Sequence, residues 1–136
     1  MQSCQWDWKF IVENHIDKEI DAEDKATEPG TTIDPKPKWR VEPNESQVVK
    51  LQSKQSDVNT QGGGLKFGLT CGCTPQKVYF YVLGTKCGLS PCSFDEALKS
   101  RKDLAQMNFG EIYSVSAWYD SKKAEGRIVF RHRQTK

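Results

Sequence analysis

The sequence lacks any apolar run near the roughly 20 residues that a membrane-spanning helix needs. Its start, MQSCQWDWKFIVENH, lacks the basic region and long apolar core of a signal peptide. No serine elbow, H-E-x-x-H or dinucleotide-binding glycine pattern occurs, and GGGLKFG lacks the G-K-[ST] ending of a phosphate loop. These absences predict a cytoplasmic protein that is not an enzyme.

What the chain does have is β-forming sequence. Trp6, Trp8, Phe10 and Val12 occupy alternate positions, as in a strand with one buried face. A second alternating run covers residues 65–73, and KVYFYVLGT (77–85) is apolar on both faces, which is typical of a central strand. Two more strands are expected from EIYSVSAWY (111–119) and RIVFRHR (127–133). The pattern predicts a β-rich fold, either an all-β sandwich or barrel or an α+β sheet, with six to eight mostly antiparallel strands.

One helix is expected over residues 93–107. Ser93 and Glu96 form a capping box, and the apolar residues that follow share one helical face. These apolar residues are Phe94, Ala97, Leu98, Leu104 and Ala105. The acidic segment 13–28 places Ile16 and Ile20 four residues apart, which favours a short second helix.

The length of 136 residues suits one compact domain with a single core. We expect residues 1–30 to form an N-terminal strand and acidic segment, which could act as an exchangeable arm. Residues 31–43 are rich in proline and predict an extended connection. Residues 44–136 then form the β-rich core.

Five cysteines are present, and four of them, Cys71, Cys73, Cys87 and Cys92, cluster around one strand. Without an export signal they are expected to be reduced. Cys71 continues an apolar stripe, so packing in the core is one interpretation. Four soft ligands could alternatively bind zinc, although the C-x-C and C-x4-C spacings differ from the usual knuckle. A disulfide between Cys87 and Cys92 is a third alternative, and otherwise no cofactor is expected.

Charge is distributed unevenly along the chain. Residues 1–60 hold eight basic and twelve acidic side chains, whereas residues 61–136 hold twelve and six. The last sixteen residues have six bases against one acid. This asymmetry favours an anionic partner for the C-terminal part, or mutual screening of the two parts.

The last two strands can be paired by their pattern. If Asp120 faces Glu125, every opposing pair sums to 245 in residue number. One face of the hairpin is then buried, and its residues are Tyr113, Val115, Ala117, Ile128, Phe130 and His132. The other face is then basic and aromatic, and the loop that joins the strands extends it. The residues of this predicted binding face are Trp118, Arg127, Arg131, Arg133, Lys122 and Lys123.

Arginines beside an aromatic side chain are typical of single-stranded RNA binders, which neutralise phosphates and stack bases. The first hypothesis is therefore a non-catalytic protein that binds single-stranded RNA through this face. The alternatives are a structural subunit that self-associates or docks into a larger assembly, and a zinc-stabilised accessory domain. No membrane partner is expected.

One short stretch resembles a known family. Residues Tyr79–Thr85 (YFYVLGT) resemble the strand that follows the basic hairpin in coronavirus nucleocapsid RNA-binding domains. The flanking prolines and glycines of that motif are absent here, so the resemblance implies no site residue.

Overall fold

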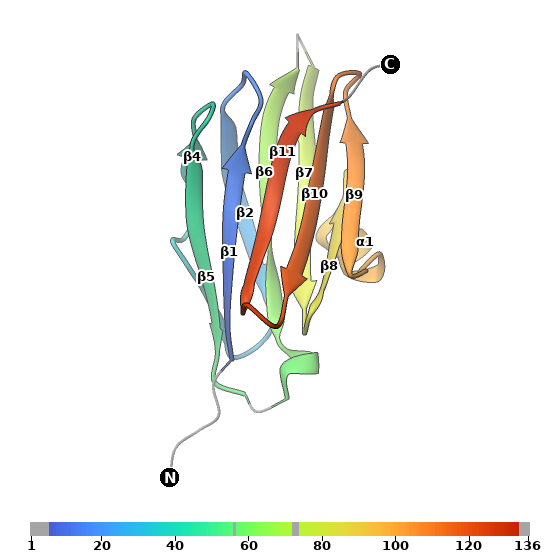
Figure 1. Ribbon diagram of the computed structural model, residues 1–136. Coiled ribbons are helices and arrows are strands. Elements are labelled where there is room, and N and C mark those ends of the chain that lie inside the picture. The colour runs from blue at the N-terminus through green and yellow to red at the C-terminus, as the bar shows by residue number, and fades with distance from the viewer. Residues whose placement is uncertain (1–5, 56, 72–73, 134–136) are drawn as a thin grey trace.

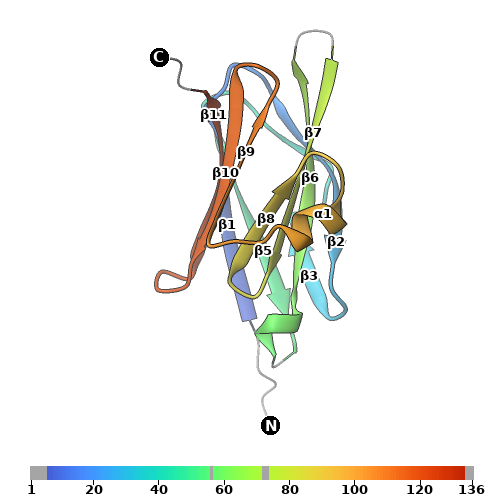
Figure 2. The same ribbon diagram turned by 90° about the vertical axis from the view of Figure 1, so that its right-hand side faces the viewer.

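Two β-sheets face each other across one core in the computed structural model, which describes residues 6–55, 57–71 and 74–133 (Figures 1 and 2). The first sheet has six strands, in the spatial order β3 (Thr31–Asp34), β5 (Ser46–Ser53), β1 (Trp6–Asn14), β11 (Glu125–His132), β10 (Tyr113–Asp120) and β9 (Leu104–Phe109). The second sheet has five strands, in the order β4 (Trp39–Val41), β2 (Ile20–Thr27), β6 (Gly62–Cys71), β7 (Thr74–Leu83) and β8 (Lys86–Ser90).

The predicted β-rich class is confirmed, and the fold is a sandwich. Neighbouring strands are antiparallel except β1 and β11, which run parallel. The eleven strands exceed the six to eight expected, because the sequence pattern does not predict the edge strands β3, β4, β8 and β9, and because β2, which lies inside its sheet, was expected to be helical. Within the described residues, no helix is both long and apolar enough to cross a membrane.

Aromatic side chains join the two sheets in the core. The rings of Phe10 and Phe80 lie 5.1 Å apart, and those of Phe67 and Phe130 lie 5.3 Å apart, both edge to face. Each pair links a strand of one sheet to a strand of the other. The alternation of buried and exposed residues seen in the sequence therefore gives each sheet one face on this core and one outer face.

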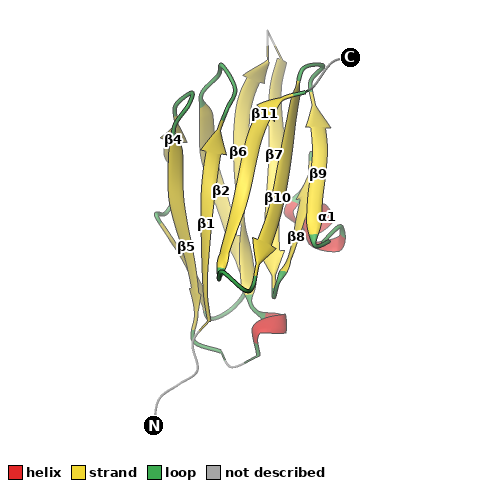
Figure 3. Ribbon diagram, in the orientation of Figure 1, coloured by secondary structure: helices red, strands yellow, loops and turns green. Residues whose placement is uncertain are grey.

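The helix is much shorter than expected. Its capping box forms as predicted, with the Ser93 side chain accepting a hydrogen bond from the Glu96 amide, but α1 ends at Lys99 (Phe94–Lys99, Figure 3). Leu104 and Ala105, which were placed on the helix, begin strand β9. The backbone of β9 pairs with β10 along its whole length. In the sequence, two adjacent apolar residues do not distinguish the start of this strand from the end of a helix.

The proline-rich segment does more than connect. It contributes β3 and β4, each of which is one of the two edge strands of its sheet. Pro35 and Pro37 lie between these strands, while Pro29 and Pro43 flank them. Proline is tolerated at sheet edges because one side of an edge strand needs no hydrogen-bond donor.

The acidic segment is a turn and a strand instead of a helix. Asn14, which is buried, shapes the turn: its side-chain oxygen accepts from the Ile16 amide, and its side-chain nitrogen donates to the Lys18 and Val41 carbonyls. Such local bonds compete with helix formation. Strand β1 lies in the interior of the six-stranded sheet, where Trp8 donates its indole N–H to the Gly84 carbonyl.

Candidate functional site

The predicted register of the last hairpin is correct. Strands β10 and β11 pair Trp118 with Arg127, Ser114 with Arg131, and Asp120 with Glu125. Val115, Ala117, Ile128 and Phe130 face the core as expected. His132 is exposed, with its ring centroid 5.2 Å from that of Tyr113 and the two rings tilted, so the buried face of β11 ends at Phe130 and does not reach His132 as predicted.

A shallow groove lies on the outer face of the six-stranded sheet, across β9, β10 and β11. Its volume is about 480 Å³, and it is lined by Asp103, Leu104, Gln106, Ser116, Trp118 and Arg131. Alternation places Ser116 and Trp118 outward from β10, and Leu104 and Gln106 outward from β9. The groove therefore combines an indole and an aliphatic side chain with a hydroxyl, an amide and a guanidinium. We call it the Trp118 groove.

Trp118 and Arg131 were expected at a binding site, whereas the β9 residues of the groove were missed. Their signal in the sequence was the alternation of Leu104, Gln106 and Asn108, which are exposed, with buried Ala105 and Phe109. This alternation was hidden by the expected extension of the helix.

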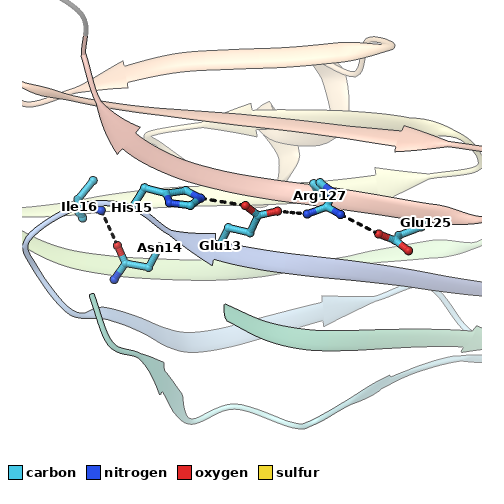
Figure 4. Close-up of polar contacts among 6 residues, drawn as sticks. All are labelled: Glu13, Asn14, His15, Ile16, Glu125 and Arg127. Atoms are coloured by element: carbon cyan, nitrogen blue, oxygen red, sulfur yellow. Dashed lines mark hydrogen bonds and ion pairs between the residues drawn. The ribbon is translucent and has the colours of Figure 1, made fainter. Parts of the chain in front are cut away.

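Arg127 is not free to bind a phosphate in the way the sequence suggested. Its guanidinium binds the carboxylates of Glu13 on β1 and Glu125, the latter at 3.2 Å (Figure 4). His15 also contacts Glu13, with 2.9 Å between Nε2 and the carboxylate oxygen. Burial raises the pKa of Glu13, but the bonds from His15 and Arg127 outweigh burial and hold it below the ordinary value. The Arg127 charge is thus offset by two carboxylates.

The other predicted basic residues differ in their surroundings. Arg131 is exposed in the Trp118 groove and has no ion-pair partner among residues 6–55, 57–71 and 74–133. Arg133 donates from Nη1 to the Glu111 carbonyl. Lys122 and Lys123 are exposed in the hairpin loop, where their amides donate to the Asp120 carboxylate. Trp118 and Arg131 thus line one groove, whereas Lys122 and Lys123 lie in the hairpin loop and do not line it.

The backbones of Cys71 and Cys87 lie far apart in the five-stranded sheet. Cys87 on β8 pairs with Val82 on β7, which in turn pairs with Gly63 on β6. Cys71 lies eight positions further along β6, so its backbone is about 26 Å from this level of the sheet. Cys71 and Cys87 therefore cannot ligate the same zinc ion. Cys73 and the side chain of Cys71 lie outside the described part of the chain.

Cys87 and Cys92 are both free thiols, so the Cys87–Cys92 disulfide does not form. Cys87 is buried in the core, and burial raises the pKa of its thiol to about 12. Cys92 is exposed beside the start of α1.

These environments predict different thiol reactivities, because the thiolate is the reactive form and must be reached by the reagent. Without denaturant, Cys92→Ser should remove one thiol that reacts quickly with a disulfide reagent, and Cys87→Ser should remove none. In denaturant, each variant should have one reactive thiol fewer than the wild type. A quickly reacting Cys87 in the folded protein would contradict its placement in the core.

The fold has a similar known structure. Neither a protein-family model nor a curated protein matches the sequence. The chain is similar to the lipid-binding protein Nakanori, with a TM-score of 0.60 and 7% identity over 95% of this chain and 71% of that one. At this identity the similarity establishes a shared β-sandwich fold.

Proposed function

We propose that this chain is a non-catalytic binding protein whose Trp118 groove takes the phosphate-bearing headgroup of a lipid, with no metal or other cofactor. The observation that carries the proposal is the exposed guanidinium of Arg131, which has no ion-pair partner among the described residues and lines the same groove as the indole of Trp118. Arginine binds phosphate oxygens through charge-assisted hydrogen bonds. The indole and Leu104 supply apolar surface for the carbon atoms next to the phosphate.

Three further observations support a lipid over single-stranded RNA. Arg127, which RNA binding would need, is neutralised by Glu13 and Glu125, and Asp103 borders the groove with a second negative charge. The affinity of a protein for RNA depends mainly on how many phosphates are neutralised by basic side chains that have no acidic partner of their own. The fold is also similar to that of a lipid-binding protein.

The proposal predicts that Arg131→Gln weakens binding of a short-chain phospholipid, such as monomeric dihexanoylphosphatidylcholine, by at least about tenfold. Hydrogen bonds to charged groups contribute about 1.5–3 kcal/mol, which corresponds to this factor or more. Calorimetric titration measures the affinity. Arg133→Gln is the matched control, because Arg133 bonds to the Glu111 carbonyl and does not line the groove. It should bind like the wild type.

Equal binding by the wild type and Arg131→Gln would overturn the headgroup site. If the wild type does not bind phospholipid but binds single-stranded RNA in a salt-sensitive way, the RNA hypothesis replaces the headgroup site. A wild type that binds neither ligand but scatters light as an oligomer would favour the structural-subunit hypothesis.

A further inference from the structure

An apolar row crosses the outer face of the six-stranded sheet, perpendicular to its strands. The cross-strand register aligns Leu104 with Trp118, Trp118 with Arg127, Arg127 with Ile11, and Ile11 with Val48. Four of these five side chains are apolar or aromatic, and they come from β9, β10, β1 and β5. The remaining one is Arg127, whose charge is offset by Glu13 and Glu125.

The row is open to solvent at both ends. Leu104 is 50% exposed and Val48 is 40% exposed, and Trp118 and Ile11 are partly exposed between them. Strands lie about 4.8 Å apart, so the row spans about 19 Å. The Trp118 groove covers only its β9–β10 end. A single headgroup in the groove would leave Ile11 and Val48 uncovered.

Charges on the strands around this row balance. The alternation of buried and exposed residues directs three basic and three acidic side chains to this face besides Arg127 and its two partners. They are Lys9, Lys50, Arg131, Asp7, Asp34 and Asp120. Asp103, which lines the groove just before β9, and Arg133, which follows β11, add one acid and one base. A surface with balanced charge and a central apolar row does not favour a polyanion. It is compatible with a zwitterionic surface that accepts apolar side chains between its headgroups.

We infer that this face docks flat on a zwitterionic phospholipid bilayer, with the apolar row from Leu104 to Val48 in the interfacial region. The inference rests on the proposed headgroup site and extends it. Tryptophan and aliphatic side chains partition into the interface between headgroups and acyl chains. A bilayer fits this face better than a second copy of the chain does, because the groove opens on the same face and a second copy would cover it.

Val48→Asp tests the docking surface separately from the groove, because Val48 lies on β5, three strand spacings beyond Trp118. Binding to phosphatidylcholine vesicles, measured by co-sedimentation, should weaken at least about tenfold, since an apolar contact is lost and a charge enters the interface. Binding of monomeric dihexanoylphosphatidylcholine should stay within about twofold of wild type, since the groove is unchanged. Cys92→Asp, which adds the same charge at an exposed position beside α1, is the control and should leave both affinities unchanged.

Vesicle binding by Val48→Asp at the wild-type affinity would overturn the docking surface and leave the headgroup site intact. Wild-type binding of the short-chain lipid but not of vesicles would have the same meaning. Failure of the wild type to bind the short-chain lipid would overturn the proposed function, and the docking inference with it. If the wild type is a dimer and Val48→Asp makes it a monomer, this face binds a second copy of the chain and not a bilayer.

Discussion

Phe130→Ala is expected to lower the free energy of unfolding by about 3–5 kcal/mol, the range for deleting a buried phenylalanine side chain. Phe130 is fully buried on β11, and its ring lies 5.3 Å from that of Phe67 in the opposite sheet and 6.0 Å from that of Phe109 on β9. Removing it would leave a cavity between the two sheets at the hairpin that also carries Arg127 and Arg131. Urea unfolding followed by tryptophan fluorescence measures the loss.

The neighbouring residue provides the control. Arg131 points to the outer face, and its replacement by Ala should change stability by no more than about 0.5 kcal/mol. Where Phe130→Ala does not fold, Phe130→Leu removes less of the side chain and should cost less than the alanine variant but more than Arg131→Ala. Similar losses for Phe130→Ala and Arg131→Ala would contradict the assignment of inner and outer faces on β11.

The strand pairing of the last hairpin could be predicted in detail because the residues that determine its register lie close together in the sequence. Residue alternation has a period of two, and a shift of one position would send the apolar set of Val115, Ile128 and Phe130 to the solvent. A short loop between the strands leaves few alternative registers. Both features can be seen within 20 residues of sequence, so the pairing of Trp118 with Arg127 followed directly.

Strand β9 was not predictable in the same way. A capping box at Ser93 marks where a helix begins, but no glycine or proline between Lys99 and Leu104 marks its end. The strand becomes stable only when its backbone pairs with β10. Tertiary pairing therefore decided between helix and strand, and the β9 half of the Trp118 groove was missed for that reason.

The ion pairs that neutralise Arg127 could not be predicted from the sequence either. Glu13 lies 114 positions earlier in the chain, and it reaches Arg127 only because β1 pairs in parallel with β11. The charge asymmetry did suggest that the acidic first part could screen the basic second part. Which acid would meet which arginine depends on strand order in the sheet, and a parallel pairing between distant strands leaves no local pattern.

This neutralisation predicts that removing the two acids uncovers a nucleic-acid-binding face. Glu13→Gln combined with Glu125→Gln should raise the affinity for generic single-stranded RNA at low salt about tenfold, because Arg127 becomes available beside Arg131 and Arg133. Each phosphate contact contributes about −0.7 to the log–log salt slope for a single strand, so three arginines should give a slope near −2. Filter binding at several salt concentrations measures both quantities.

Glu45→Gln combined with Glu96→Gln is the matched control, because it changes net charge by the same amount at exposed positions that do not contact Arg127. It should bind RNA no better than the wild type, since local pairing and not net charge limits the face. An equal gain in both double variants would mean that long-range charge controls binding. A wild type that already binds RNA with the steep slope would mean that Arg127 exchanges its carboxylates for phosphates, and the face would then serve RNA after all.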